Sequence, residues 1–143
     1  FRGATALVFR GDDGLDELTT TGHSHIWEVS RGALTEHDLD PRDLGIPRAR
    51  MEDLIGGTPE ENAEVVRRVL QGEEGAFRDI VLLNTAAGIV TYDLVQAPES
   101  VDRPILERLR SALDVAAVAI DSGAALAKLD SWVTSTQRHA MGK

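Results

Sequence analysis

The feature of this sequence that most limits its fold is a short apolar run followed at once by a group of acids. Residues 4–9, ATALVF, are almost wholly apolar, and Arg10 and Gly11 close the run. A run of this length bounded by turn residues is typical of a strand buried on both faces, as in α/β proteins. We therefore expect a buried strand near the start of the chain and a loop that carries the acids directly after it.

That loop, residues 11–17, is called the acidic loop below. It holds four carboxylates, on Asp12, Asp13, Asp16 and Glu17, and its two glycines let the backbone bend between them. Ligands of open α/β sheets collect beyond the carboxyl ends of strands, and Mg²⁺ needs only one or two carboxylates when waters and substrate phosphates complete its octahedron. By spacing alone, however, a solvated acidic turn is the commoner interpretation, because runs of charge usually face water.

The next segments predict a hairpin. Residues 26–29 and 34–39 favour strands, and residues 30–32 between them form a turn. Residues 40–43, DPRD, contain turn formers that end the second strand.

From about Arg48 the sequence predicts helices. Thr58, Pro59 and Glu61 make a capping box that opens the first of them, with an apolar stripe at Ala63, Val66, Val69 and Leu70, and Gly72 ends it. Residues 79–92 are locally ambiguous between strand and helix, and their length favours a buried helix. Periodicity predicts two more helices, over residues 100–121 and 124–136, the second of which we expect to bury Leu126, Leu129 and Val133.

Composition narrows the class of protein. The chain has 143 residues, 42% of them hydrophobic and 27% charged, which is typical of one folded domain with its own core. A net charge of −9 argues against partners such as nucleic acid or a membrane surface. The lack of cysteine rules out disulfides and thiolate chemistry and fits a cytoplasmic location. No apolar run approaches the roughly 20 residues of a membrane span.

Three further polar groups have a structural interpretation that we prefer. His23 and His25 share a face of an extended chain and could begin a zinc site, but no third ligand is evident, so we expect hydrogen-bonded or solvated imidazoles there and at His37 and His139. Hydroxyls of residues 19–21 could contact phosphate, although a plain strand or turn is the commoner role. Asn84, within an apolar helix, is expected to make a structural polar contact.

Taken together, these segments resemble the anthranilate phosphoribosyltransferases. GDDGLDELT in residues 11–19 resembles the HG-x-x-GLDE-[IL]-[ST] segment of that family, which is a highly specific signal. Further segments match the family's GG…ENA, VLLNAA and A-I-x-SG-x-A motifs in order: Gly56-Gly57 with residues 61–63, Gly72 and Gly75, residues 81–86, and residues 119–124. The resemblance covers essentially the whole chain, but only the later part of a considerably longer family sequence.

The resemblance implies a fold and an activity. Residues 1–143 would be the C-terminal portion of the large α/β domain of this phosphoribosyltransferase class, related to nucleoside phosphorylases, with a few strands followed by several helices. The N-terminal helical domain, the start of the α/β domain and most substrate-binding residues would be missing. The family transfers phosphoribose from 5-phosphoribosyl 1-pyrophosphate to anthranilate, releasing pyrophosphate, in tryptophan biosynthesis. A parent homodimer is expected.

The resemblance also assigns roles. Asp16 and Glu17 would bind Mg²⁺, and no residue of this chain need act as a catalytic nucleophile. We expect no transferase activity from this chain alone, because a catalyst that works by positioning needs both walls of its cleft. Asp12 and Asp13 would be flanking charges. Arg10 stands where the family usually has His, and His23 and His25 fall in a stretch that is more often rich in Ser and Thr.

Two other functions compete with this interpretation. The first is a non-catalytic paralogue of the same fold that binds nucleic acid or another ligand, and the second is a nucleoside phosphorylase of similar architecture. The intact Asp16 and Glu17 pair and the net charge of −9 disfavour the binding paralogue, and the magnesium-type loop disfavours the nucleoside phosphorylase. If the chain is one part of a longer fold, apolar surface should be exposed around residues 4–9 and on one late helix, where the rest would pack.

Overall fold

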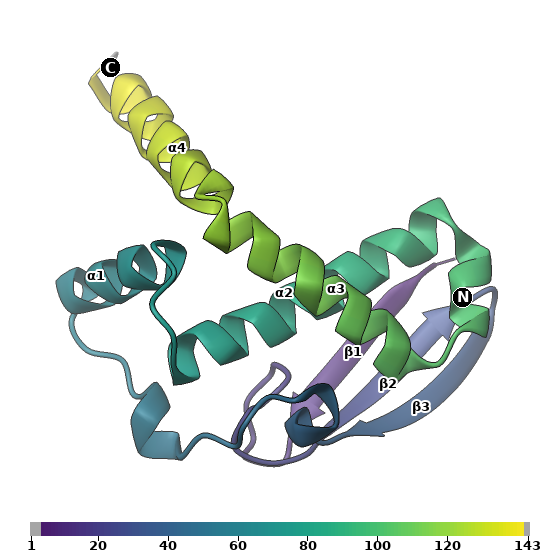
Figure 1. Ribbon diagram of the computed structural model, residues 1–143. Coiled ribbons are helices and arrows are strands. Elements are labelled where there is room, and N and C mark those ends of the chain that lie inside the picture. Colours follow the sequence, from purple (N-terminus) through teal and green to yellow (C-terminus); the bar gives the residue numbers. More distant parts are fainter. Residues whose placement is uncertain (1–3, 142–143) are drawn as a thin grey trace.

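A computed structural model describes residues 4–141 and shows a small sheet followed by helices (Figure 1). The elements, in chain order, are β1 (Ala6–Gly11), β2 (Ser24–Ser30), β3 (Ala33–Leu39), η1 (Pro41–Leu44), η2 (Met51–Leu54), α1 (Pro59–Leu70), α2 (Ala76–Gln96), η3 (Pro98–Asp102), α3 (Ile105–Asp121) and α4 (Ala124–Met141). The chain between β3 and α1 therefore holds two short 3-10 helices, η1 and η2, and is otherwise irregular, although helix was expected from about Arg48.

The three strands form one antiparallel sheet in the order β1-β2-β3. The predicted hairpin is confirmed, and Ser30 pairs with Ala33 across a two-residue turn. Both turn residues have positive φ, 50° at Arg31 and 77° at Gly32. This conformation is favoured in two-residue hairpin turns because its twist matches that of the flanking strands.

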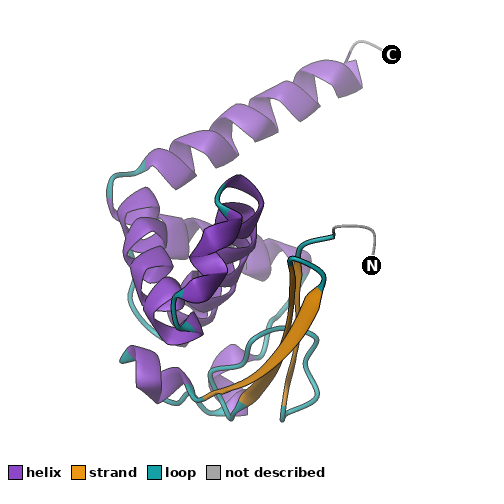
Figure 2. Cartoon of the chain, turned by 90° about the vertical axis from the view of Figure 1, so that its right-hand side faces the viewer, coloured by secondary structure: helices purple, strands orange, loops and turns teal. Residues whose placement is uncertain are grey.

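One face of the sheet is covered by helices and the other is open. Figure 2 shows the strands on one side of the molecule and the helices stacked against them. The core between these layers includes Ile26 from β2, Leu83 and Leu94 from α2 and Leu109 from α3, all almost fully buried. Because side chains alternate along a strand, the opposite face carries His25 and Trp27 and is only partly covered.

This arrangement corrects the expectation for the first strand. β1 exists, but it is not buried on both faces within this chain, since Val8 is 55% exposed. The apolar run predicted the strand correctly. No segment among residues 4–141, however, packs against its second face. The expected exposed apolar surface is therefore confirmed at β1.

The helices begin and end where local chemistry places them. The capping box of α1 is confirmed, because the Thr58 side chain accepts from the Glu61 N–H and Glu61 accepts from the Thr58 N–H. The buried helix over residues 79–92 is confirmed within α2. α3 starts at Ile105 rather than near residue 100, because Pro104 lacks an N–H and disfavours helical backbone at the residue before it.

α4 projects away from the rest of the molecule (Figure 1). It is longer than predicted, but Leu126, Leu129 and Val133 are only half-buried, so the expected burial of this stripe is wrong for this chain. Trp132 on α4 is 67% exposed, and Val118 on α3 is exposed to a similar degree. The late helices thus also show the apolar surface expected of them. Across residues 4–141 no helix is long and apolar enough to cross a membrane.

Candidate metal centre

The acidic loop lies where β1 ends and turns back toward β2. Its backbone closes on itself, since the Gly11 N–H donates to the Leu15 carbonyl and the Gly14 N–H to the Gly11 carbonyl, both at 3.0 Å. Gly14 has a φ of 91°, which a residue with a side chain rarely adopts. The Asp12 N–H donates to the His23 carbonyl at 2.9 Å, so the loop is also joined to the start of β2.

Asp13 holds the inside of this loop together. One carboxylate oxygen accepts from the Leu15 N–H at 3.1 Å, and the other accepts from the hydroxyls of Thr19 and Thr21, the latter at 2.7 Å. Partial burial alone would raise the pKa of Asp13, but the hydroxyl hydrogen bonds outweigh it and lower the pKa. Asp13 therefore has a structural role beyond that of a flanking charge.

This packing explains two features of the sequence. A Cβ on Gly11 would collide with the Asp13 carboxylate and lie 3.0 Å from the Thr19 side chain, so any other residue there would force these side chains to shift. The hydroxyls of Thr19 and Thr21 bond to Asp13 and to each other, which supports the structural interpretation of residues 19–21.

Asp16 and Glu17 differ from Asp13. Asp16 is exposed and Glu17 is half-buried, and among residues 4–141 neither carboxylate accepts a hydrogen bond or pairs with a cationic side chain. Partial burial, the nearby Asp16 and then Asp13 raise the pKa of Glu17. Adjacent anions without a counter-charge repel each other, and a bound cation would reverse that energy.

The donor set fits Mg²⁺ better than it fits a metal held by protein groups alone. Within residues 4–141 no group of three or more His, Cys, Asp or Glu side chains is arranged to hold a metal ion. Mg²⁺ takes one or two carboxylates and fills its other positions with waters and substrate phosphates. Asp16 and Glu17 offer two free, hard oxygen donors of this kind.

Asn84 fastens the end of the acidic loop to α2. Its side-chain oxygen accepts from the Leu18 N–H at 2.9 Å, and its amide nitrogen donates to the Leu18 carbonyl at 2.8 Å and the Ile80 carbonyl at 3.0 Å. The expected structural contact of Asn84 is confirmed. The sequence did not indicate that its partner would be the residue directly after Glu17.

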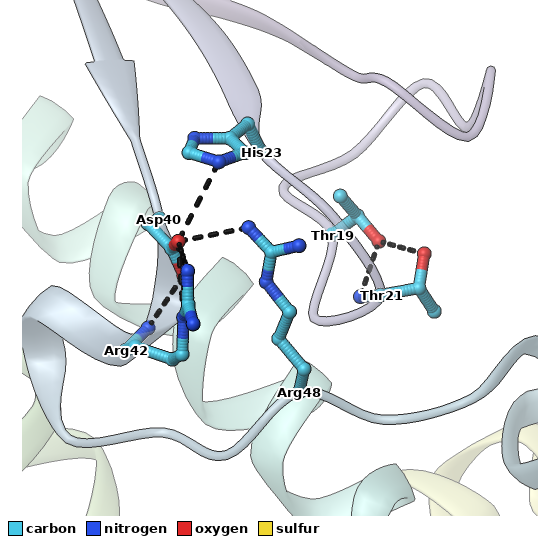
Figure 3. Close-up of polar contacts among 6 residues, drawn as sticks. All are labelled: Thr19, Thr21, His23, Asp40, Arg42 and Arg48. Carbon is cyan, nitrogen blue, oxygen red and sulfur yellow. Dashed lines mark hydrogen bonds and ion pairs between the residues drawn. The ribbon is translucent and has the colours of Figure 1, made fainter.

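A second polar cluster lies beside the loop and centres on Asp40 (Figure 3). Its carboxylate accepts from Arg42 at 2.6 Å and from Arg48 at 2.8 Å, and His23 lies 3.5 Å away. The two arginines hold the pKa of Asp40 far below its usual range. The Ala49 N–H donates to the Thr20 carbonyl at 3.0 Å, so this cluster supports the turn that follows the acidic loop.

The sequence identified Asp40 and Arg42 only as turn formers and gave Arg48 no role. Charged residues eight positions apart in an irregular segment have no periodicity that would reveal their pairing. The signal available was the Asp-Pro at residues 40–41, which predicts the N-terminal cap of a short turn. Asp40 does cap η1 by accepting from the Arg42 N–H.

His25, His37 and His139 are hydrogen-bonded and His23 is partly exposed beside Asp40, as expected of hydrogen-bonded or solvated imidazoles. His25 contacts Asp38 at 2.8 Å and Glu36 at 3.0 Å on the open face of the sheet. His37 lies 2.9 Å from Glu28, and His139 contacts the Ser135 carbonyl.

The sequence did not predict the buried ion pair between Glu28 and Arg108. Arg108 on α3 donates to both oxygens of Glu28 on β2, at 2.6 and 2.8 Å, and Glu28 is only 2% exposed. Burial alone would raise the pKa of Glu28, but the hydrogen bonds from Arg108 and His37 outweigh it and lower the pKa. This pair joins the helical layer to the sheet that carries the loop.

Several curated proteins have sequences similar to this chain. An anthranilate phosphoribosyltransferase from Leifsonia xyli subsp. xyli is 66% identical over 136 residues, which are 95% of this chain and 39% of that protein. The corresponding protein of Thermobifida fusca is 55% identical over 139 residues, or 97% of this chain and 38% of its own length. The chain therefore spans about two fifths of the length of these curated relatives.

Solved structures show the same fold. The anthranilate phosphoribosyltransferase of Thermus thermophilus is 35% identical, with a TM-score of 0.72 over 92% of this chain and 36% of that one. The Saccharomyces cerevisiae enzyme in complex with 4-fluoroanthranilate is 25% identical, with a TM-score of 0.76 over 96% of this chain and 37% of that one. The expected α/β class is thereby confirmed.

The family itself is shown by a match that covers most of the chain. The family model described as "Glycosyl transferase family, a/b domain" matches residues 1–126, which include the acidic loop, the sheet, α1, α2 and α3. This chain therefore belongs to that glycosyl transferase family, within its a/b domain.

Proposed function

We propose that this chain is the C-terminal part of the a/b domain of an anthranilate phosphoribosyltransferase. The parent protein would transfer phosphoribose from 5-phosphoribosyl 1-pyrophosphate to anthranilate with release of pyrophosphate. The relatives that carry this name match 94–97% of the chain at 48–66% identity, and this range of identity supports a shared activity. A homodimeric parent and a cytoplasmic location remain predictions.

The observation that carries the site assignment is a contrast between neighbouring acids. The carboxylates of Asp13 and Asp40 accept hydrogen bonds from hydroxyls and arginines. Those of Asp12, Asp16 and Glu17 have no partner within residues 4–141, and of these three only Asp16 and Glu17 belong to the GLDE segment that resembles the family motif. We infer that Asp16 and Glu17 bind Mg²⁺. A Saccharomyces cerevisiae variant enzyme that is 25% identical to this chain has been solved with Mg bound, which supports the choice of ion.

The proposed assignment gives the chain's own residues the following roles. When bound, Mg²⁺ supplies electrostatic stabilisation of the negative charge that builds on the departing pyrophosphate. Asp16 and Glu17 fix where that positive charge lies, and Asp13 with its two threonine hydroxyls keeps the loop from unfolding into water. Catalysis of this kind depends on positioning, so the chain on its own should lack activity because it holds one side of the cleft.

Kinetics of the full-length polypeptide test the assignment. Asp16→Ala and Glu17→Ala should each lower kcat/KM by about a hundredfold or more, the scale of losing one well-placed electrostatic group. Both variants should also need more Mg²⁺ for half-maximal rate. The matched control is Asp12→Ala, which removes an exposed carboxylate of the same loop and should cost much less. Equal losses at Asp12, Asp16 and Glu17, or an unchanged Mg²⁺ requirement, would refute the assignment.

A further inference from the structure

The side chain of Asn84 forms hydrogen bonds with both backbone polar groups of Leu18. It accepts from the Leu18 N–H and donates to the Leu18 carbonyl, at 2.9 and 2.8 Å. The N–H belongs to the peptide unit that joins Glu17 to Leu18, and the carbonyl to the next one. Because peptide units are planar and rigid, these two hydrogen bonds fix the orientation of the backbone that leaves Glu17.

Most other hydrogen bonds of this segment are local. Asp13 bonds within residues 13–21, and the Thr19 N–H donates to the Ser24 hydroxyl at 2.9 Å. For residues 12–20, the described part of the chain beyond β2 contributes hydrogen bonds from Asn84 and from the Ala49 N–H. Only the Asn84 contact is adjacent to Glu17, and it comes from a long helix in the middle of the core.

The contact is also costly to break. Leu18 is fully buried, so its N–H and carbonyl have no access to water in place of the amide. Removing the amide leaves both backbone groups unsatisfied, and the loop can regain hydrogen bonds only by moving outward. An octahedral Mg²⁺ site tolerates little displacement of its carboxylates, so such a movement should weaken the metal site.

We propose that Asn84 is a positioning residue for the metal pair. It sets the affinity for the divalent ion by holding the Glu17–Leu18 peptide against α2, without touching the ion itself. This inference rests on the proposed function, since it takes Asp16 and Glu17 as the ligands.

The test uses the full-length polypeptide and the variants Asn84→Leu, which keeps the side-chain volume, and Asn84→Ala, which removes that volume as well as the amide. The affinity for Mn²⁺ alone is measured by electron paramagnetic resonance, and backbone exchange of residues 15–20 by hydrogen–deuterium exchange. The matched control is Thr91→Val on the same helix, which removes the hydrogen bond from the Thr91 hydroxyl to the Ala87 carbonyl but lies away from the loop. Melting temperatures identify any variant that fails to fold.

We expect both Asn84 variants to bind Mn²⁺ about tenfold more weakly, the size of loss typical when a group that orients a metal ligand is removed. Exchange at residues 15–20 should accelerate, while Thr91→Val should match the parent in both measurements. Faster exchange with unchanged Mn²⁺ affinity in a folded Asn84 variant would overturn the proposal and leave Asn84 a structural residue.

Asp16→Ala and Glu17→Ala separate this proposal from the one it rests on. If they weaken Mn²⁺ binding and the Asn84 variants do not, only the positioning role is wrong. If they leave Mn²⁺ binding unchanged, the metal assignment is wrong and the role of Asn84 is refuted with it.

Discussion

The acidic loop with its sheet and the C-terminal helix α4 are held in this molecule by different means. The loop is fastened to α2 by Asn84, and β2 is joined to α3 by the buried pair of Glu28 and Arg108. α4 contacts α1 and α3, yet none of its residues that the structure describes is buried. Its long-range ion pair, between Arg67 and Asp130 at 3.0 Å, is exposed.

The difference shows which part of the chain fixes its own geometry. Buried polar contacts have defined partners and distances, so they specify one position for the loop. An amphipathic helix with a half-buried apolar stripe favours packing against another apolar surface, but its stripe does not specify which surface or at what position. The end of the molecule that carries the acidic loop therefore has an internally determined shape, whereas the position of α4 depends on few contacts.

The largest expected effect is at the buried ion pair. Arg108→Met would leave the buried Glu28 with only its contact to His37 and should lower the free energy of unfolding by about 3–5 kcal/mol. Arg67→Met, which breaks the exposed pair with Asp130 on α4, should cost at most about 1 kcal/mol. Urea unfolding followed by circular dichroism compares the two variants. If both variants lost a similar free energy of unfolding, the proposed difference between the two regions would be wrong.

Two leucines offer the same comparison for apolar packing. Leu83→Ala on α2 empties a fully buried position and should cost about 2–5 kcal/mol in the free energy of unfolding. Leu129→Ala on α4 removes a half-buried side chain and should cost well under half as much in the isolated chain. Thermal unfolding of both variants measures the difference. A larger cost for Leu129→Ala in the full-length polypeptide than in the isolated chain would show that other segments cover α4.

A smaller effect should appear at the base of the acidic loop. Gly11→Ala forces a Cβ against the Asp13 carboxylate and the Thr19 side chain, and should destabilise the protein by about 1–3 kcal/mol. The control is Gly22→Ala, where the added Cβ would lie 3.6 Å from the Asp12 Cβ in ordinary contact. That variant should be neutral or slightly stabilising. Equal melting temperatures for the two would show that the loop is looser than described.

The smallest effect concerns pH. The pKa of Asp40 is lowered by hydrogen bonds from Arg42 and then Arg48, so Asp40 contributes stability above the ordinary aspartate pKa of about 3.9 and loses it as the pH falls further. Asp40→Asn should therefore flatten the fall in stability between about pH 5 and pH 2. Melting temperature as a function of pH measures this slope. A variant with the parent's slope would show that Asp40 is not coupled to folding.

Much of the local structure followed from the sequence alone. The hairpin turn, the capping box of α1 and the existence of α2, α3 and α4 were predicted correctly, because periodicity and turn chemistry depend on residues close together in the chain. The acidic loop was found for the same reason, since its acids and glycines are neighbours. The resemblance of these local motifs also led to the correct family.

The tertiary structure alone decided which of these residues meet. Leu18 and Asn84 are 66 positions apart, and Glu28 and Arg108 are 80 positions apart, so no local pattern could pair them. The tertiary structure also decided that one face of β1 and the apolar stripe of α4 are not fully buried within residues 4–141. Hydrophobicity predicts that a surface favours burial, but not which partner packs against it. Local patterns determined the elements and the candidate ligands, and only the folded chain determined how the ligands are held.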